Sequence, residues 1–135
     1  PATLRRQRQM CIRDRFLANA INQAELAGLK SGNIIIDPGF GFGKTLQHNL
    51  QLLRSLEKLQ ILEKPVLVGI SRKSMLGTIL GKPVNERVIG GVATTVIAAQ
   101  KGANIIRTHD VGATLDAIKV VEAVSTVESG SANKR

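Results

Sequence analysis

Apolar residues along this chain fall into short runs that alternate with stretches of helical periodicity. Three runs without polar alternation predict strands at residues 33–37, 65–70 and 103–107. Apolar positions that recur every three or four residues predict helices at residues 16–29, 45–60, 86–101 and 113–126, with a short helix following Ser74. Strands that are apolar throughout are typical of parallel sheets covered by helices. This order predicts an α/β fold of three βα units with parallel strands, in either an open doubly wound sheet or an eight-stranded barrel.

The two ends of the chain differ from this pattern. Residues 1–15 contain five arginines and one aspartate, and no apolar periodicity joins them to the helix that follows. Basic segments poor in acids also occur as transit peptides. We interpret residues 1–15 instead as a non-native or disordered leader left by processing, cloning or sequence assembly. The folded domain is assigned to residues 16–126 and a polar tail to residues 127–135.

The net charge of +9 comes mostly from these ends, since the leader supplies +4 and the last two residues supply +2. Basic and aromatic residues are not interleaved as they are in surfaces that stack bases, so we expect no nucleic-acid partner. No apolar run approaches the length of about 18 residues that a membrane span requires. Cys11 is the only cysteine, which excludes an intrachain disulfide and favours a reducing, cytoplasmic compartment.

Polar and charged side chains follow each predicted strand directly. Asp37 ends the first strand, residues 71–74 (Ser-Arg-Lys-Ser) follow the second, and Arg107, Thr108, His109 and Asp110 follow the third. Ligands of parallel α/β folds bind at the carboxyl ends of the strands. We therefore predict one shared site, in which the cationic side chains of Lys73 and Arg107 attract an anion.

The loop at residues 37–44 contains three glycines, whose backbone allows a ligand to approach closely. Its two aromatic residues, Phe40 and Phe42, are expected to form contact surface rather than core. The ending Gly43-Lys44-Thr45 resembles a Walker phosphate loop, but Pro38 stands where that motif requires glycine and has no N–H to offer. A loop shaped for a flat or anionic ligand is the preferred interpretation.

Each candidate also has a structural interpretation. Asp37 could cap its own loop, Lys73 could be a solvated surface lysine, and Arg107 could form an ion pair with Asp110. His109 could bind only a backbone carbonyl. Ser74 is expected to cap the short helix after it. The chain has no histidine–cysteine or histidine–carboxylate cluster at metal spacing, and neither Ser71 nor Ser74 lies in a glycine-flanked elbow, so neither a zinc site nor a hydrolytic triad is expected.

Three motifs, in this order and spacing, resemble the C-terminal part of the dihydropteroate synthase family. They are Asp-Pro-Gly-Phe-Gly-Phe-Gly-Lys at 37–44, Gly-Ile-Ser-Arg-Lys-Ser at 69–74 and Ile-Ile-Arg-Thr-His-Asp at 105–110. The resemblance covers about residues 16–126 and implies the C-terminal portion of a TIM (β/α)₈ barrel, with these strands as the sixth to eighth. It implies a transferase of folate biosynthesis, a sulfonamide target, that joins 6-hydroxymethyl-7,8-dihydropterin diphosphate to para-aminobenzoate and releases pyrophosphate.

The same resemblance implies a role for each matching residue. Asp37 would bind the pterin ring in a loop that Gly41 keeps open, and Phe42 would form a wall for the aminobenzoate. Lys73 would bridge the two subsites, and Ser74 would receive the aminobenzoate carboxylate. Arg107 and His109 would hold the diphosphate, and Thr108 would be a further substrate-binding residue. The catalytic residues would be Lys73, Arg107 and His109.

The resemblance is incomplete, because such a barrel has about 250 residues. The family's first strand, with its magnesium-binding asparagine, has no counterpart here, so Mg²⁺ is expected only in the full-length enzyme and no metal ligand is expected in this chain. A homodimer is left open as the full-length assembly. Two alternatives also remain: a methyltransferase-type barrel domain that binds a pterin, which should lack the Ser-Arg-Lys-Ser segment, and a non-enzymatic basic binding module.

We expect the 135-residue chain alone to show little or no synthase turnover. The strands that complete the pterin site are absent from it, and its outermost strands would be unpaired edges that favour aggregation. Pyrophosphate release by the purified chain, assayed with both substrates, would contradict this expectation.

Overall fold

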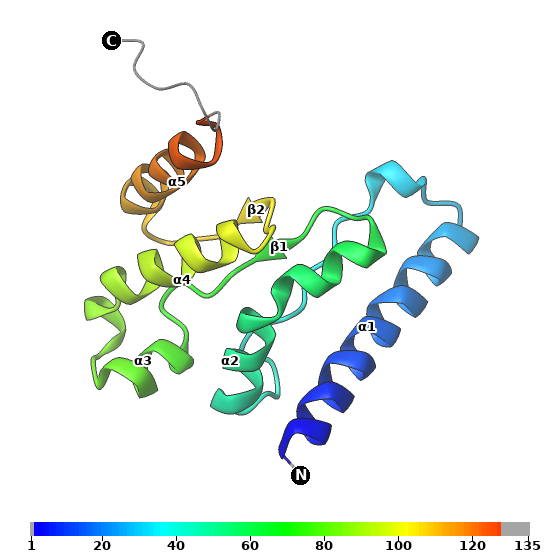
Figure 1. The fold of residues 1–135 in the computed structure, drawn as a ribbon, viewed down its shortest axis with the longest axis horizontal. Coiled ribbons are helices and arrows are strands. Elements are labelled where there is room, and N and C mark those ends of the chain that lie inside the picture. Colours follow the sequence, from blue (N-terminus) through cyan, green and yellow to red (C-terminus); the bar gives the residue numbers. More distant parts are fainter. Residues whose placement is uncertain (1, 128–135) are drawn as a thin grey trace.

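A computed structural model describes residues 2–127, with side chains from residue 13 onward (Figure 1). Five α-helices, three 3₁₀ helices (η) and two short strands are assigned in this range. In chain order they are α1 (Ala2–Leu26), η1 (Ser31–Asn33), α2 (Leu46–Arg54), η2 (Leu56–Leu62), β1 (Leu67–Val68), α3 (Ser74–Leu80), η3 (Val84–Glu86), α4 (Val88–Gln100), β2 (Ile105–Ile106) and α5 (Val111–Ser125). The predicted helices are confirmed, although the one expected at 45–60 is divided between α2 and η2.

Three strand segments run side by side in the same direction. β1 pairs with β2 in parallel, with Leu67 opposite Ile105, and Ile36 forms a parallel bridge to Val66 on the other side of β1. The prediction of three adjacent parallel segments is therefore confirmed. The first segment is shorter than expected, because residues 31–33 form η1 and only Ile36 completes a bridge. Closure of these segments into a complete barrel stays a prediction.

The hydrophobic core lies between the strands and the helices that flank them (Figure 1). Strand residues Ile36, Val66 and Val68 are at most 4% exposed, and they pack with leucines from α2 and η2. Burying each such aliphatic side chain stabilises the fold by about 1.5–3 kcal/mol. α5 adds little to this core, because Thr114 is its only buried residue and the apolar side chain of Val124 is 70% exposed.

Helix α1 runs without a break from Ala2, through the position where the leader was expected to end. The proposal that residues 1–15 are non-native stays a prediction, and the side chains of residues 2–12 are outside the described part. The predicted polar tail also lies outside the described residues, apart from residue 127. None of the helices in the described range combines the length and apolar character needed to cross a membrane.

The glycine-rich loop places its two phenylalanines in opposite environments. Phe40 is 0% exposed and belongs to the core, whereas Phe42 is 72% exposed. The prediction that both rings form contact surface is therefore wrong for Phe40. Gly39 and Gly41 adopt positive φ values of 73° and 87°, which reverse the chain on either side of Phe40. The buried Asn49 of α2 accepts a hydrogen bond from the Gly41 N–H at 2.9 Å and holds the loop inward.

An ion pair joins the loops that follow β1 and β2. The Arg72 guanidinium donates to both carboxylate oxygens of Asp110, at 2.6 Å and 3.3 Å. The Asp110 side chain is only 17% exposed, and its hydrogen bond to Arg72 holds the pKa of that carboxyl below its usual value. The alternative in which Arg107 pairs with Asp110 is wrong, since Arg72 occupies that carboxylate. Two chain segments 38 positions apart are tied by this contact.

We predict that Phe40→Ala lowers the free energy of unfolding by about 3–5 kcal/mol, because it empties a fully buried ring site. The matched control is Phe42→Ala, which removes an exposed ring and should cost less than about 1 kcal/mol. Urea denaturation of the two variants measures the difference. Equal losses of unfolding free energy in the two variants would contradict the burial of Phe40 and the exposure of Phe42.

The Arg72–Asp110 pair also predicts a pH dependence of stability. Because the folded pKa of Asp110 lies below its ordinary value of 3.8, the stabilisation is complete above pH 3.8 and is lost as the pH falls through the folded pKa. Asp110→Asn should therefore lower the urea midpoint at pH 7 and converge with the unaltered chain at low pH. Asp116→Asn, at an exposed position of α5, is the control and should leave the midpoint unchanged at both pH values. A gap that persists below the folded pKa would contradict the assignment.

Candidate functional site

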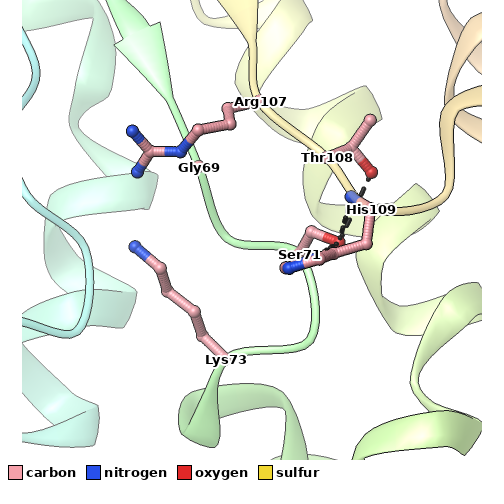
Figure 2. Close-up of a pocket in the computed structure, with 6 residues that line it drawn as sticks. All are labelled: Gly69, Ser71, Lys73, Arg107, Thr108 and His109. Atoms are coloured by element: carbon pink, nitrogen blue, oxygen red, sulfur yellow. Dashed lines mark hydrogen bonds between the residues drawn. The ribbon is translucent and has the colours of Figure 1, made fainter.

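A pocket of about 240 Å³ opens where β1 and β2 end (Figure 2). It is lined by Gly69, Ser71, Lys73, Arg107, Thr108 and His109. Four of the residues predicted for the site, Lys73, Arg107, Thr108 and His109, thus lie around one cavity. They converge because β1 and β2 are parallel neighbours and deliver their following residues to the same edge.

Lys73 and Arg107 form the cationic side of the pocket, with their charged ends pointing the same way (Figure 2). The Lys73 ammonium donates to the Phe40 carbonyl at 2.7 Å and lies 5.0 Å from the centre of the Phe42 ring. Burial lowers the pKa of Lys73, and the charge of Arg107 lowers it further, whereas Asp37 opposes both. The Lys73 ammonium is therefore fixed by these contacts, and Lys73 is not a solvated surface lysine.

Two glycines make room for these cations. A β-carbon at position 69 would lie 2.8 Å from a terminal guanidinium nitrogen of Arg107, so a side chain there would force the guanidinium to shift from its place beside residue 69. A β-carbon on Gly41 would lie 3.4 Å from the Lys73 side chain, at a φ of +87° that side chains rarely adopt. Gly41 therefore lies beside the Lys73 side chain, and its positive φ is the reason why glycine is favoured there.

Asp37 contacts both its own loop and the cationic side. One carboxylate oxygen accepts the Gly39 N–H at 2.8 Å, so the alternative in which Asp37 caps its loop is confirmed. The other oxygen lies 3.8 Å from Arg107, in an ion pair whose two side chains are 38% and 58% exposed. An exposed pair of this kind contributes little to stability. Asp37 therefore keeps one oxygen, and its negative charge, accessible next to the pocket.

The opposite side of the pocket is a hydrogen-bonded group centred on Ser71 (Figure 2). Its hydroxyl oxygen accepts the backbone N–H of His109 at 3.1 Å and lies 3.0 Å from His109 Nδ1. The Thr108 hydroxyl lies 3.4 Å away from the same oxygen. His109 thus bonds a side chain and not the backbone carbonyl considered from sequence. With Nδ1 engaged, Nε2 is the ring nitrogen left for a ligand.

Ser74 does not occupy the position expected for it. Helix α3 begins at Ser74 itself and its N-cap is Lys73, without a side-chain capping bond, so the prediction that Ser74 caps this helix is wrong. The chain turns sharply at Arg72, and the first helical residue lies one position earlier than a Ser74 cap would place it. Ser74 is exposed and does not line the pocket, so its role toward a carboxylate stays a prediction.

Three residues that shape this region have contacts that the sequence did not predict, although Ser71 belongs to the segment expected at the shared site. Ser71 orients His109, the buried Asn49 holds the glycine-rich loop, and the Lys44 ammonium donates to the Gly39 carbonyl. Burial lowers the pKa of Lys44, and nearby positive charges, Lys73 among them, lower it further. Ser71 and Lys44 lie inside the recognised motifs, so their sequence position was a usable signal, whereas Asn49 had none.

The arrangement can hold an anion between Lys73, Arg107 and His109 and an amine-bearing group beside Asp37. In the described part of the chain, no group of three histidine, cysteine or carboxylate side chains could hold a metal ion. The magnesium ion expected in the full-length enzyme, held by a residue outside this chain, stays a prediction. The described side chains offer hydrogen bonds and fixed charges to a ligand.

Comparison with known proteins relates this chain to a protein family. A family model described as pterin binding enzyme matches residues 6–109. A dihydropteroate synthase of Haemophilus influenzae is 52% identical over 110 residues, which are 82% of this chain and 40% of that relative. The chain therefore spans about two fifths of the length of this relative.

Solved structures agree with the sequence comparison. The Yersinia pestis dihydropteroate synthase in a sulfonamide drug complex superposes with a TM-score of 0.87 at 48% identity, covering 89% of this chain and 44% of that one. The Xanthomonas albilineans enzyme with 7,8-dihydropteroate gives a TM-score of 0.87 at 45% identity, covering 89% and 48%. Both similarities extend over the strands and loops that build the pocket, and with the family match they lead to one conclusion. This chain belongs to the family of pterin-binding enzymes, whose fold is a TIM barrel.

Proposed function

We propose that this chain forms the C-terminal part of a dihydropteroate synthase. One observation carries the proposal: Lys73, Arg107 and His109 line one pocket, and Asp37 contacts its cationic side. The product bound by the Xanthomonas albilineans relative, 7,8-dihydropteroate, contains a dihydropterin joined to an aminobenzoate. A pocket that combines anion-binding cations with a carboxylate suits the substrates from which such a product forms.

The reaction joins the methylene carbon of a dihydropterin diphosphate to the nitrogen of para-aminobenzoate. The bond between the methylene carbon and the diphosphate oxygen breaks, pyrophosphate leaves with the bonding electrons, and the amine nitrogen forms the new bond and loses a proton. Negative charge builds up on the departing oxygen, so stabilising it lowers the barrier most. Fixed cations in a partly buried pocket perform that task without reorganisation.

Each residue of the site receives a role in this scheme. Arg107 and His109 bind the departing diphosphate, with Thr108 beside them and Ser71 fixing the His109 ring. Asp37 accepts hydrogen bonds from the amine and ring N–H groups of the pterin through its accessible oxygen. Lys73 lies between these groups and Phe42, and there it bridges the pterin and aminobenzoate subsites. Gly41 leaves space for Lys73, and Ser74 receives the aminobenzoate carboxylate.

The proposal extends to properties that depend on the whole enzyme. They are a Mg²⁺ ion held by a residue outside this chain, a homodimeric assembly and a cytoplasmic location.

A chimera provides the test, with this chain replacing the matching segment of the Haemophilus influenzae relative. We expect it to form dihydropteroate from the two substrates. Lys73→Ala and Arg107→Ala should each lower turnover about tenfold to a hundredfold, because a charge-assisted hydrogen bond contributes about 1.5–3 kcal/mol.

Lys119→Ala is the matched control, since it removes a lysine from an exposed position of α5, away from the pocket. It should retain the turnover of the unaltered chimera. A folded chimera without dihydropteroate synthesis, or near-normal kinetics in both pocket variants, would refute the proposal. Methyl transfer in place of aminobenzoate condensation would point to the methyltransferase alternative.

A further inference from the structure

Arg87 lies outside the pocket but reaches the backbone that carries Lys73. It stands at the N-cap of α4, and its Nε donates to the Lys82 carbonyl at 2.9 Å. One terminal nitrogen of the same guanidinium donates to the Arg72 carbonyl at 3.0 Å and lies 3.4 Å from the Lys73 carbonyl. A single planar group thus connects the segment before α3 to the segment after it.

The Arg87 guanidinium packs against Gly77 of α3, so closely that a β-carbon at position 77 has no room. A β-carbon at Gly77 of α3 would lie 2.3 Å from one guanidinium nitrogen of Arg87 and 2.6 Å from its central carbon. Both distances are far below ordinary contact, so any side chain at position 77 must displace the arginine. Glycine in a helix interior is unfavourable relative to alanine. The close approach of Arg87 supplies a physical reason for its presence here.

The backbone at residues 71–73 needs such support. Arg72 has a φ of 57°, a left-handed conformation that is uncommon for residues with a β-carbon. The Arg72 carbonyl accepts from Arg87, and its side chain is held by Asp110, so both halves of this residue are anchored. The next residue, Lys73, leaves the turn with φ −68° and ψ 159° and directs its ammonium to the Phe40 carbonyl.

We propose that Arg87 is a positioning residue whose guanidinium, seated against Gly77, fixes the backbone of Arg72 and Lys73 and thereby aims the Lys73 ammonium into the pocket. The role assigned to Lys73 in substrate binding rests on the proposed function, but its orientation by Arg87 does not. Arg87 does not line the pocket, so its effect on a ligand passes through Lys73. The charged groups that act on the Lys73 ammonium there are Arg107, Asp37 and the neighbouring Lys44.

The test uses a pair of glycine substitutions in the full 135-residue chain. Gly77→Ala inserts a methyl group into the space that the Arg87 guanidinium occupies. Gly91→Ala, in α4, adds the same group where nothing lies within 4 Å. Both changes raise helix propensity, so neither should unfold its helix. Arg87→Met is the second test variant, which removes the donors and keeps much of the side-chain volume.

The measurement is the titration of Lys73, followed by NMR in protein labelled with ¹³Cε-lysine and assigned with Lys73→Arg. In the unaltered chain the pKa of Lys73 lies below its ordinary value of 10.5. Gly77→Ala and Arg87→Met should both raise it toward 10.5, because a released ammonium moves into water. Gly91→Ala should leave it unchanged. A Lys73 titration in folded Gly77→Ala or folded Arg87→Met that matches the unaltered chain would overturn the proposal.

The same substitutions in the chimera separate this inference from the proposed function. Gly77→Ala should raise the KM for para-aminobenzoate at least about threefold and lower kcat, with Gly91→Ala at the unaltered values. An inactive chimera whose Lys73 titration still responds to Gly77→Ala refutes the function and leaves the positioning role intact. An active chimera with no response of Lys73 in either measurement refutes the positioning role alone.

Discussion

The backbone hydrogen bonds of residues 66–68 are the constraint on which the rest of the structure depends. Leu67 donates to the Ile36 carbonyl at 2.8 Å on one side, and on the other side Arg107 donates to the Val68 carbonyl at 3.0 Å. The middle segment therefore fixes the direction and register of both neighbours. Because all three segments are parallel, the residues after each one meet at a single edge. Asp37, Lys73 and Arg107 come from distant parts of the sequence, and this pairing is what makes them neighbours.

Much of the site could be predicted from sequence, because the order of apolar and charged residues along the chain marks where each strand ends. Strands of a covered parallel sheet are apolar throughout, so the first charged residue after an apolar run marks the strand end, as Asp37 and Arg107 do, although Ile35 is 53% exposed in this chain. Parallel order then places these ends together without knowledge of side-chain packing. The identity of the expected ligand came from the motif resemblance, because neither periodicity nor charge indicates a particular molecule.

The errors have a common physical cause, which is that they depended on side-chain direction within loops. The choice between Phe40 and Phe42 as the core residue is made by two positive φ values and by a hydrogen bond to Asn49, a residue on the next helix. The partner of Asp110 is Arg72 because of the left-handed turn at that arginine. Likewise, Arg87 reaches the loop at residues 72–73 from 14 or 15 positions further along the chain. Local propensity carries no information about contacts of this kind.

The burial of Phe40 has an electrostatic consequence. Its ring is enclosed in the core, while its carbonyl oxygen accepts the hydrogen bond of the Lys73 ammonium. One residue therefore couples the packing of the interior to the placement of a positive charge in the pocket. A change of volume among the leucines around Phe40 would shift that oxygen, and with it the ammonium. Substitutions at apolar positions that never contact the pocket are therefore expected to alter the placement of its positive charge.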